Sequence, residues 1–191
     1  ELDYFGLETA VFGVRPWTDG ATFRAGPGMS EGRSCCAATF AGGRVLVLGG
    51  LSRRYSLRSL RSTEVLDAET AAFTAGPNLL EGRHGCAAVQ IDAERVLVAG
   101  GYGGGFLRTT EILHHYTLTV TPGPDLLSAR AGLAAVALDA GRILFVGGVG
   151  GGSQSTGGTE ILTLETMAFA PGPAVITARW GCAAVALDEH R

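Results

Sequence analysis

Arginine and glutamate recur along the chain in a pattern that could serve either structure or ligand binding. Successive arginines of the set lie 50, 47 and 49 residues apart. The four positions are Arg33, Arg83, Arg130 and Arg179. Three Thr-Glu pairs keep the same step and end in Glu64, Glu111 and Glu160. A guanidinium group can bind a carboxylate or main-chain carbonyls and so fix the register of repeated units. Gathered at the mouth of a channel, the same arginines would attract an anionic ligand. The spacing leaves both interpretations open.

The cysteines follow the same repeat. Cys36, Cys86 and Cys182 occupy one repeated position, which holds Leu133 in the remaining unit, and Cys35 stands one residue before the first of them. A position that accepts Cys or Leu is typical of an apolar core, whereas clustered cysteines could form a redox pair or a metal site. Their spacing matches no zinc pattern, and two adjacent residues would point to opposite faces of a strand. We expect reduced core thiols, with no metal and no cofactor.

No combination of residues indicates catalysis. The four histidines are scattered, and no Ser, His and acidic residue can be brought together from their spacing. The glycine-rich segment 101–106 ends in Phe106, where a dinucleotide-binding fingerprint requires Gly or Ala, and no helix is expected after it. We therefore assign no catalytic residue, and the sequence favours a binding module over an enzyme.

Short apolar runs separate the recurring residues. In the second unit the segments 85–91, 95–99, 109–114 and 117–121 are expected to be β-strands. The first two are almost continuously apolar, which is typical of strands buried on both faces. The fourth is the weakest, as expected for an outer edge strand. No segment shows an apolar period of 3.6 residues, so we expect very little helix.

Two glycine motifs complete each unit. A Gly-Gly pair ends the second apolar run in three units, and a Gly-Pro pair recurs four times with the steps of the arginines. A four-stranded unit of this length cannot cover its own faces, and radial stacking of several units into a β-propeller solves that problem. The period also lies close to that of kelch repeats.

The order of these motifs resembles the kelch repeat. Each unit gives an arginine, an apolar strand, a core of the Gly-Arg-Val-Leu-Val-x-Gly-Gly type, a loop, Thr-Glu-Val/Ile-Leu and Gly-Pro. The resemblance covers nearly all of 21–191 and implies an all-β, kelch-type β-propeller. The Tyr and Trp that kelch motifs usually carry near the third and fourth strands are replaced by smaller residues, which predicts a more loosely packed outer strand. The replacements are Leu66 and Phe73, Leu113 and Val120, and Leu162 and Phe169.

We expect one propeller domain over 1–191. It would contain a partial repeat at 1–20, three full repeats at 21–178 and a truncated repeat at 179–191. That makes about three full four-stranded blades with partial blades at both ends. Either the two ends share a blade and close a small ring or, as we favour, the chain is a fragment of a larger one.

The loops that follow the Gly-Gly pairs differ most between units, at 51–61, 102–108 and 149–158. Binding residues concentrate on loops that a rigid framework holds, and Arg and aromatic residues dominate binding hot spots. The alternative is a solvated loop without a partner. The predicted partner-binding residues are Arg53, Arg54, Tyr55, Arg58, Arg61, Tyr102, Phe106 and Arg108.

Composition limits the kinds of partner. The chain of 191 residues has a formal net charge of −3, which argues against nucleic acid and anionic membranes. No apolar run could span a bilayer and no signal peptide is visible, so a cytoplasmic location is slightly favoured. We expect an interaction scaffold that binds a protein or peptide through its loop face. The alternative is a domain that binds or processes a carbohydrate or small anion at the channel mouth.

Overall fold

The computed structural model describes residues 25–52, 58–151 and 155–186, and these residues form β-strands and loops without any helix. The expected partial repeats at 1–20 and at the end of the chain therefore lie wholly or partly outside the described residues. Twelve of the strands form three four-stranded antiparallel sheets, and two short strands form a separate hairpin. The all-β fold expected from the sequence is confirmed.

The first sheet has the order β1-β2-β5-β6, and the hairpin β3-β4 extends from the loop between β2 and β5. Their bounds are β1 Ala37–Ala41, β2 Arg44–Leu48, β3 Leu51–Ser52, β4 Arg58–Ser59, β5 Thr63–Asp67 and β6 Ala72–Ala75.

The second and third sheets repeat this order. Their strands are β7 Ala87–Gln90, β8 Arg95–Ala99, β9 Thr110–His114 and β10 Thr119–Pro122, then β11 Ala131–Asp139, β12 Arg142–Val149, β13 Thr159–Thr163 and β14 Ala168–Gly172. All pairings are antiparallel between sequence neighbours within each sheet, as expected for a meander.

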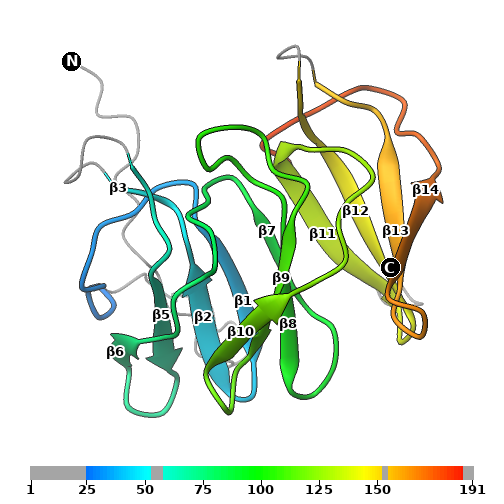
Figure 1. Cartoon of the computed structure of the whole chain (residues 1–191). Helices are drawn as coiled ribbons and strands as arrows, with labels where there is room; N and C mark the ends of the chain where they lie inside the picture. Colours follow the sequence, from blue (N-terminus) through cyan, green and yellow to red (C-terminus); the bar gives the residue numbers. More distant parts are fainter. Residues whose placement is uncertain (1–24, 53–57, 152–154, 187–191) are drawn as a thin grey trace, which may run out of the picture.

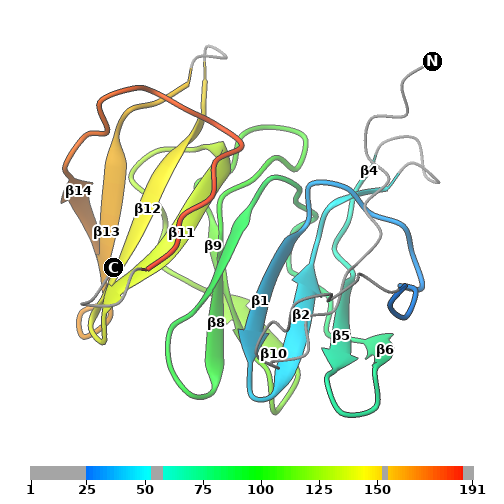
Figure 2. The same cartoon turned by 180° about the vertical axis from the view of Figure 1, so that it is seen from behind.

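The three sheets stand side by side like successive blades of a propeller (Figures 1 and 2). The first strand of each sheet is innermost, so that β7 lies between β1 and β11. The described sheets form an arc that does not close into a ring. In Figure 1 the hairpin turns between the first two strands of each sheet lie along the lower edge of the arc, and the described parts of the loops after the Gly-Gly pairs lie along its upper edge.

The middle sheet is buried on both faces, which accounts for its continuous apolar runs. Val96 and Val98 of β8 pack in the cluster that joins the first two sheets, whereas Leu97 and Ala99 pack in the cluster that joins the last two. Alternate residues of one strand therefore belong to different cores, as the pleat requires. All four side chains are fully enclosed.

The Gly-Gly pairs connect each sheet to the next. Gly100 and Gly101 have φ values of +63° and +102°, and the amide of Gly101 donates a hydrogen bond to the carbonyl of Arg130 at 2.8 Å. A Cβ atom on Gly100 would lie 2.6 Å from that same carbonyl oxygen. The equivalent amides of Gly50 and Gly148 donate to Arg83 and Arg179. The pair is glycine because the backbone is left-handed and a neighbouring carbonyl approaches it closely.

A second set of hydrogen bonds links the starts of the inner strands. The amide of Gly85 donates to the carbonyl of Cys35, that of Gly132 to Gly85, and that of Gly181 to Gly132, all at 2.7–2.8 Å. The three glycines have positive φ, and Cys35 adopts the same conformation with φ +51°. Cys35 and Cys36 both precede β1, and Cys35 is exposed, which corrects the expectation that these adjacent cysteines lie within a strand.

The cysteines are less uniformly buried than their shared position suggested. All four are free thiols, but only Cys86 is buried, and Cys36 and Cys182 are half-buried. The expectation of a core thiol is therefore confirmed for Cys86 alone. The reason is that Cys86 lies in the middle sheet, with a sheet on either side.

The substituted aromatic positions divide between core and surface. Leu66, Leu113 and Leu162 are at most 1% exposed, whereas their partners on the outer strands, such as Phe73, are half-buried. Leucine thus fills the inner of the two positions. Looser packing of the outer strands stays a prediction.

Replacing Gly100 by alanine tests the connection between sheets. Gly100→Ala should lower the free energy of unfolding by about 2 kcal/mol or more, because a left-handed alanine is strained and its Cβ would collide with the Arg130 carbonyl. Gly105→Ala is the matched control, since a Cβ there meets nothing within 4 Å. Urea unfolding of both variants measures the difference, and equal stability would contradict this role of the pair.

Candidate functional site

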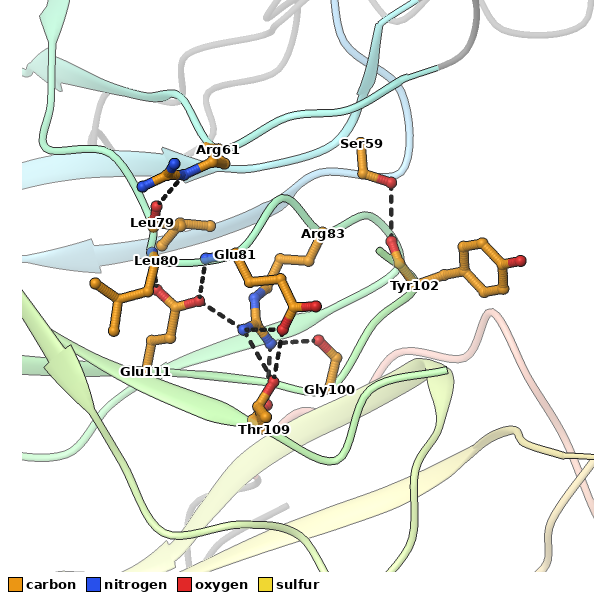
Figure 3. A network of polar contacts seen from close by, with 10 residues as sticks. All are labelled: Ser59, Arg61, Leu79, Leu80, Glu81, Arg83, Gly100, Tyr102, Thr109 and Glu111. Atoms are coloured by element: carbon orange, nitrogen blue, oxygen red, sulfur yellow. Dashed lines mark hydrogen bonds and ion pairs between the residues drawn. The ribbon is translucent and has the colours of Figure 1, made fainter. Parts of the chain in front are cut away.

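Arg83 is the centre of a buried polar cluster (Figure 3). Its Nη1 donates to the carbonyls of Gly100 and Thr109 at 2.8 and 3.0 Å, and its Nη2 lies 2.6 Å from the Oε1 of Glu111. The Arg83 side chain is fully enclosed and that of Glu111 is 2% exposed. The arginine thus joins the Gly-Gly loop to the first residues of the third strand, β9.

Glu111 completes the cluster from the other side. Its two carboxylate oxygens accept hydrogen bonds from the amides of Leu80 and Glu81 at 2.6 and 3.0 Å. Those amides belong to the loop that enters the second sheet from the first. A charge-assisted network of this kind is stable in a low-dielectric interior only when its groups are paired. The cluster therefore fixes two loops at once.

The other two sheets contain the same cluster. Arg33 pairs with Glu64 and Arg130 with Glu160, each at 2.7 Å, and the glutamates again accept two main-chain amides. The expected reach from each arginine to a glutamate and to free carbonyls is therefore present. Because these guanidinium groups are enclosed and paired, the structure gives no support for an open anion site at Arg33, Arg83 or Arg130. Arg179 is exposed, with its Nε donating to the Thr177 carbonyl at 3.1 Å.

The electrostatics of Glu64 follow from its partners. Burial alone would raise the pKa of this carboxyl group, but hydrogen bonds from the Ser30 amide and the Arg33 guanidinium outweigh it and hold the pKa below the ordinary 4.5. The folded structure therefore stabilises the ionised form of Glu64.

Two of the predicted loops meet in a groove at the end of the molecule opposite the hairpin turns. The groove encloses about 390 Å³ and is lined by Arg58, Arg61 and Tyr102, together with Ser59, His84 and three glycines. Arg58 and Ser59 form β4, Arg61 follows it, and Tyr102 comes from the next unit. Sequence analysis predicted the two arginines and the tyrosine, and the structure brings them together. Arg53, Arg54 and Tyr55 lie outside the described residues.

Main-chain contacts hold the groove in shape. The Nε of Arg61 donates to the Leu79 carbonyl at 2.7 Å, and the amide of Arg83 donates to the Leu60 carbonyl. The hydroxyl of Ser59 donates to the Tyr102 carbonyl at 2.9 Å, which ties the two loops together (Figure 3).

Ser59 and His84 were missed by sequence reasoning, and their contact has a defined chemistry. The Ser59 Oγ lies 2.8 Å from the Nδ1 of His84. The single hydroxyl hydrogen is donated to the Tyr102 carbonyl, so the imidazole Nδ1 carries a hydrogen and donates to Ser59. This direction does not activate the serine as a nucleophile. Burial lowers the pKa of His84 from 6.5, so the ring is neutral at pH 7.

One feature of the sequence could have identified His84 as a candidate site residue, namely its position directly after a repeated arginine. That position differs in every unit, as loop residues do, although the arginine before it does not change. The four residues are Ser34, His84, Ala131 and Trp180.

The two remaining predicted residues occupy different surroundings. Phe106 packs edge-on against Tyr102, with ring centroids 5.4 Å apart. Arg108 pairs through its Nε with Asp125 at 3.2 Å and is not among the residues that line the groove.

A second concavity lies beside the groove and is here called the hollow. It encloses about 490 Å³ and shares His84 and Tyr102 with the groove. Its other side chains are mainly apolar, and the principal ones are Cys36, Cys86, Phe106, Leu133, Trp180 and Cys182. Burial raises the pKa of Cys86 to about 11 and that of Cys36 above its usual value, so these thiols are protonated. Within the described ranges no three His, Cys, Asp or Glu side chains are grouped as metal ligands.

Comparison with known proteins agrees with the repeat. Residues 32–80 match the family model described as the Kelch motif, and this segment spans the first sheet and the beginning of the next loop. A search of curated proteins found no match. Among the described residues, no helix is long and apolar enough to cross a membrane.

Arg83→Met tests the buried cluster. The variant leaves the Glu111 carboxylate enclosed without its cation, so the free energy of unfolding should fall by about 3–5 kcal/mol. Arg108→Met removes an ion pair whose side chains are 58% and 45% exposed, and should cost less than about 1 kcal/mol. Chemical denaturation distinguishes the two, and equal losses would show that the buried pair has no special role.

Glu64 should make the free energy of unfolding depend on pH in the acidic range. Its pKa is lower in the folded than in the unfolded chain, so its contribution is fully present above about pH 4.5 and is lost as the pH falls through the lower folded value. Glu64→Gln should therefore be less stable at neutral pH and show a shallower loss of stability between about pH 5 and pH 3. The control Glu165→Gln changes an exposed carboxylate and should keep the wild-type slope. A wild-type slope in Glu64→Gln would refute this assignment.

Proposed function

Starting from the kelch repeat that this chain carries, we propose that the protein is a binding module for another protein or a peptide. The proposed site is the groove between the loop at 58–61 and the loop at 102–104. The observation that carries the proposal is the convergence of Arg58, Arg61 and Tyr102 from two successive units on one concave surface. Arginine and tyrosine are the residue types that most often dominate binding energy at interfaces.

The framework beneath the groove supports this use. The loops are tied to the sheets by the buried Arg83 cluster and to each other by the bond from Ser59 to Tyr102. Pre-ordered loops reduce the entropy lost on binding. The groove residues are themselves exposed or half-buried, so a ligand can contact them.

Charge favours a partner with acidic or carbonyl groups. Arg58 and Arg61 supply the positive charge of the groove, because His84 is neutral at pH 7. The groove lining contains no acidic residue in the part of the chain that the structure describes. The carboxylate of Glu81 lies beside the groove, since its Oε1 would be 3.4 Å from a Cβ on Gly103, but it accepts a hydrogen bond from the Thr109 hydroxyl and lies 3.9 Å from Arg83.

The other predicted partner-binding residues stay part of the proposal. Arg53, Arg54 and Tyr55 belong to the same loop as Arg58, and we include them in the proposed site. Phe106 packs edge-on against Tyr102. Arg108, which pairs with Asp125, remains a predicted partner-binding residue.

The second interpretation was a domain that binds or processes a carbohydrate or small anion at the channel mouth. This interpretation requires that the recurring arginines be open to a ligand. Three of the four, Arg33, Arg83 and Arg130, are already paired with glutamates. We therefore do not advance it as the function.

Selection of peptides from a random dodecamer library tests the proposal. Peptides selected on the wild-type protein should lose at least about tenfold in affinity for the double variant Arg58→Ala, Tyr102→Ala, because two hot-spot side chains are removed. Arg142→Ala is the control, since Arg142 is an exposed arginine and the first residue of β12, at the hairpin turn that lies opposite the loops after the Gly-Gly pairs. Fluorescence anisotropy with labelled peptides gives the dissociation constants.

Two results would contradict the proposal. One is a failure to enrich any binding peptide. The other is enrichment of peptides whose affinity is unchanged in the groove variant or falls equally in Arg142→Ala.

A further inference from the structure

We infer that the ligand segment bound in the groove carries an acidic residue for the groove and a nearby apolar side chain, preferably aromatic, for the hollow. This inference rests on the proposed function and deepens it, because it names the chemical class of the partner. The occupant of the hollow is a side chain of the same segment that contacts Arg58 and Arg61.

The base of the hollow is apolar because of the repeat itself. Cys36, Cys86, Leu133 and Cys182 occupy one repeated position at the inner ends of successive units, and all four line the hollow. Neutral thiols behave as small apolar groups. A charged or strongly polar group placed there would lose its hydration without compensation.

Glycines keep the hollow open. Gly85, Gly132 and Gly181 line it and carry the hydrogen bonds between inner strands. A Cβ on Gly132 would contact the Trp180 side chain, and one on Gly85 would lie 3.2 Å from the Gly132 nitrogen. The volume of about 490 Å³ falls within the roughly 300–1,000 Å³ of small-ligand pockets.

Aromatic side chains border the hollow. Trp180 is 66% exposed and Tyr102 is 36% exposed, so both leave apolar ring surface accessible to a ligand. Aromatic rings gain from edge-to-face or offset contact with a further ring in addition to the area that they bury. This favours an aromatic over a small aliphatic side chain.

The groove continues into the hollow and is positively charged, and these two features determine the acidic residue of the ligand and its distance in sequence from the apolar residue. His84 and Tyr102 line both concavities, so a segment that crosses them contacts both. The arginines on the groove side select a carboxylate, and the hollow on the other side selects an apolar group. The two ligand residues must therefore be close in sequence.

Three capped pentapeptides with glycine at positions one, three and five provide the probes. The first carries Glu and Phe at positions two and four, the second Gln and Phe, and the third Glu and Ala. In ¹⁵N-correlated NMR spectra of the whole chain, the Glu-Phe peptide should shift the amides of Gly85, Gly132 and Gly181 together with those of Gly82 and Gly103. Its dissociation constant should be at least threefold lower than that of either other peptide.

Variants of the protein show which ligand side chain occupies the groove and which occupies the hollow. Trp180→Ala should weaken the Glu-Phe peptide at least threefold and leave the Glu-Ala peptide unchanged, with the exposed Ile176→Ala as control. Arg58→Ala should weaken the Glu-Phe peptide and leave the Gln-Phe peptide unchanged, with Arg142→Ala as control. Because these four side chains are exposed, none of the variants should affect folding.

The outcomes separate this inference from the proposed function. Equal binding of the Glu-Phe and Glu-Ala peptides, or shifts confined to Gly82 and Gly103, would overturn the inference and leave the groove as a binding site. Equal binding of the Glu-Phe and Gln-Phe peptides would overturn the inference that the groove selects an acidic residue. Absence of binding by all three peptides at millimolar concentration would also overturn it, and the library selection would then judge the proposed function alone.

Discussion

The buried pairing of arginine with glutamate connects the entering loop, the Gly-Gly turn and the third strand of each described sheet. Each pair is enclosed, and each guanidinium also binds two main-chain carbonyls while each carboxylate binds two amides. An enclosed charge without these partners would be strongly unfavourable. The pair therefore requires the entering loop, the Gly-Gly turn and the third strand to hold one arrangement. It does so three times in the described chain.

This constraint explains how a sheet framework presents a defined surface. The loops at 58–61 and 102–104 belong to different sheets, but the arginine cluster and the glycine contacts fix their separation. The sheets are connected through their inner strands, where carbonyls and left-handed glycines meet. The groove and the hollow are thus products of the connections between sheets and not of any one sheet.

The sequence predicted the repeat and the strand order, because both depend on local apolar patterns and on period. Arg58, Arg61 and Tyr102 were predicted as binding residues because variable loops carry them; the structure places the three along one groove, and their role in binding stays a prediction. Burial could not be predicted for the arginines, since the same spacing suits an enclosed ion pair and an open channel. His84 and Ser59 were missed because their contact joins loops 25 residues apart that meet only after two sheets pack. Cys35 was wrongly expected in a strand. Its position requires a left-handed backbone, and the only sign of this in the sequence was that the other units have glycine there.

The buried pairs are expected to hold the loops of the proposed binding face in place. Amide hydrogen exchange at Leu80 and Glu81, whose N–H groups donate to Glu111, tests this expectation most directly. These loop amides should exchange as slowly as those of β8, because they open only when the cluster does. Exchange as fast as at Gly104 and Gly105, in the exposed part of the next loop, would contradict it.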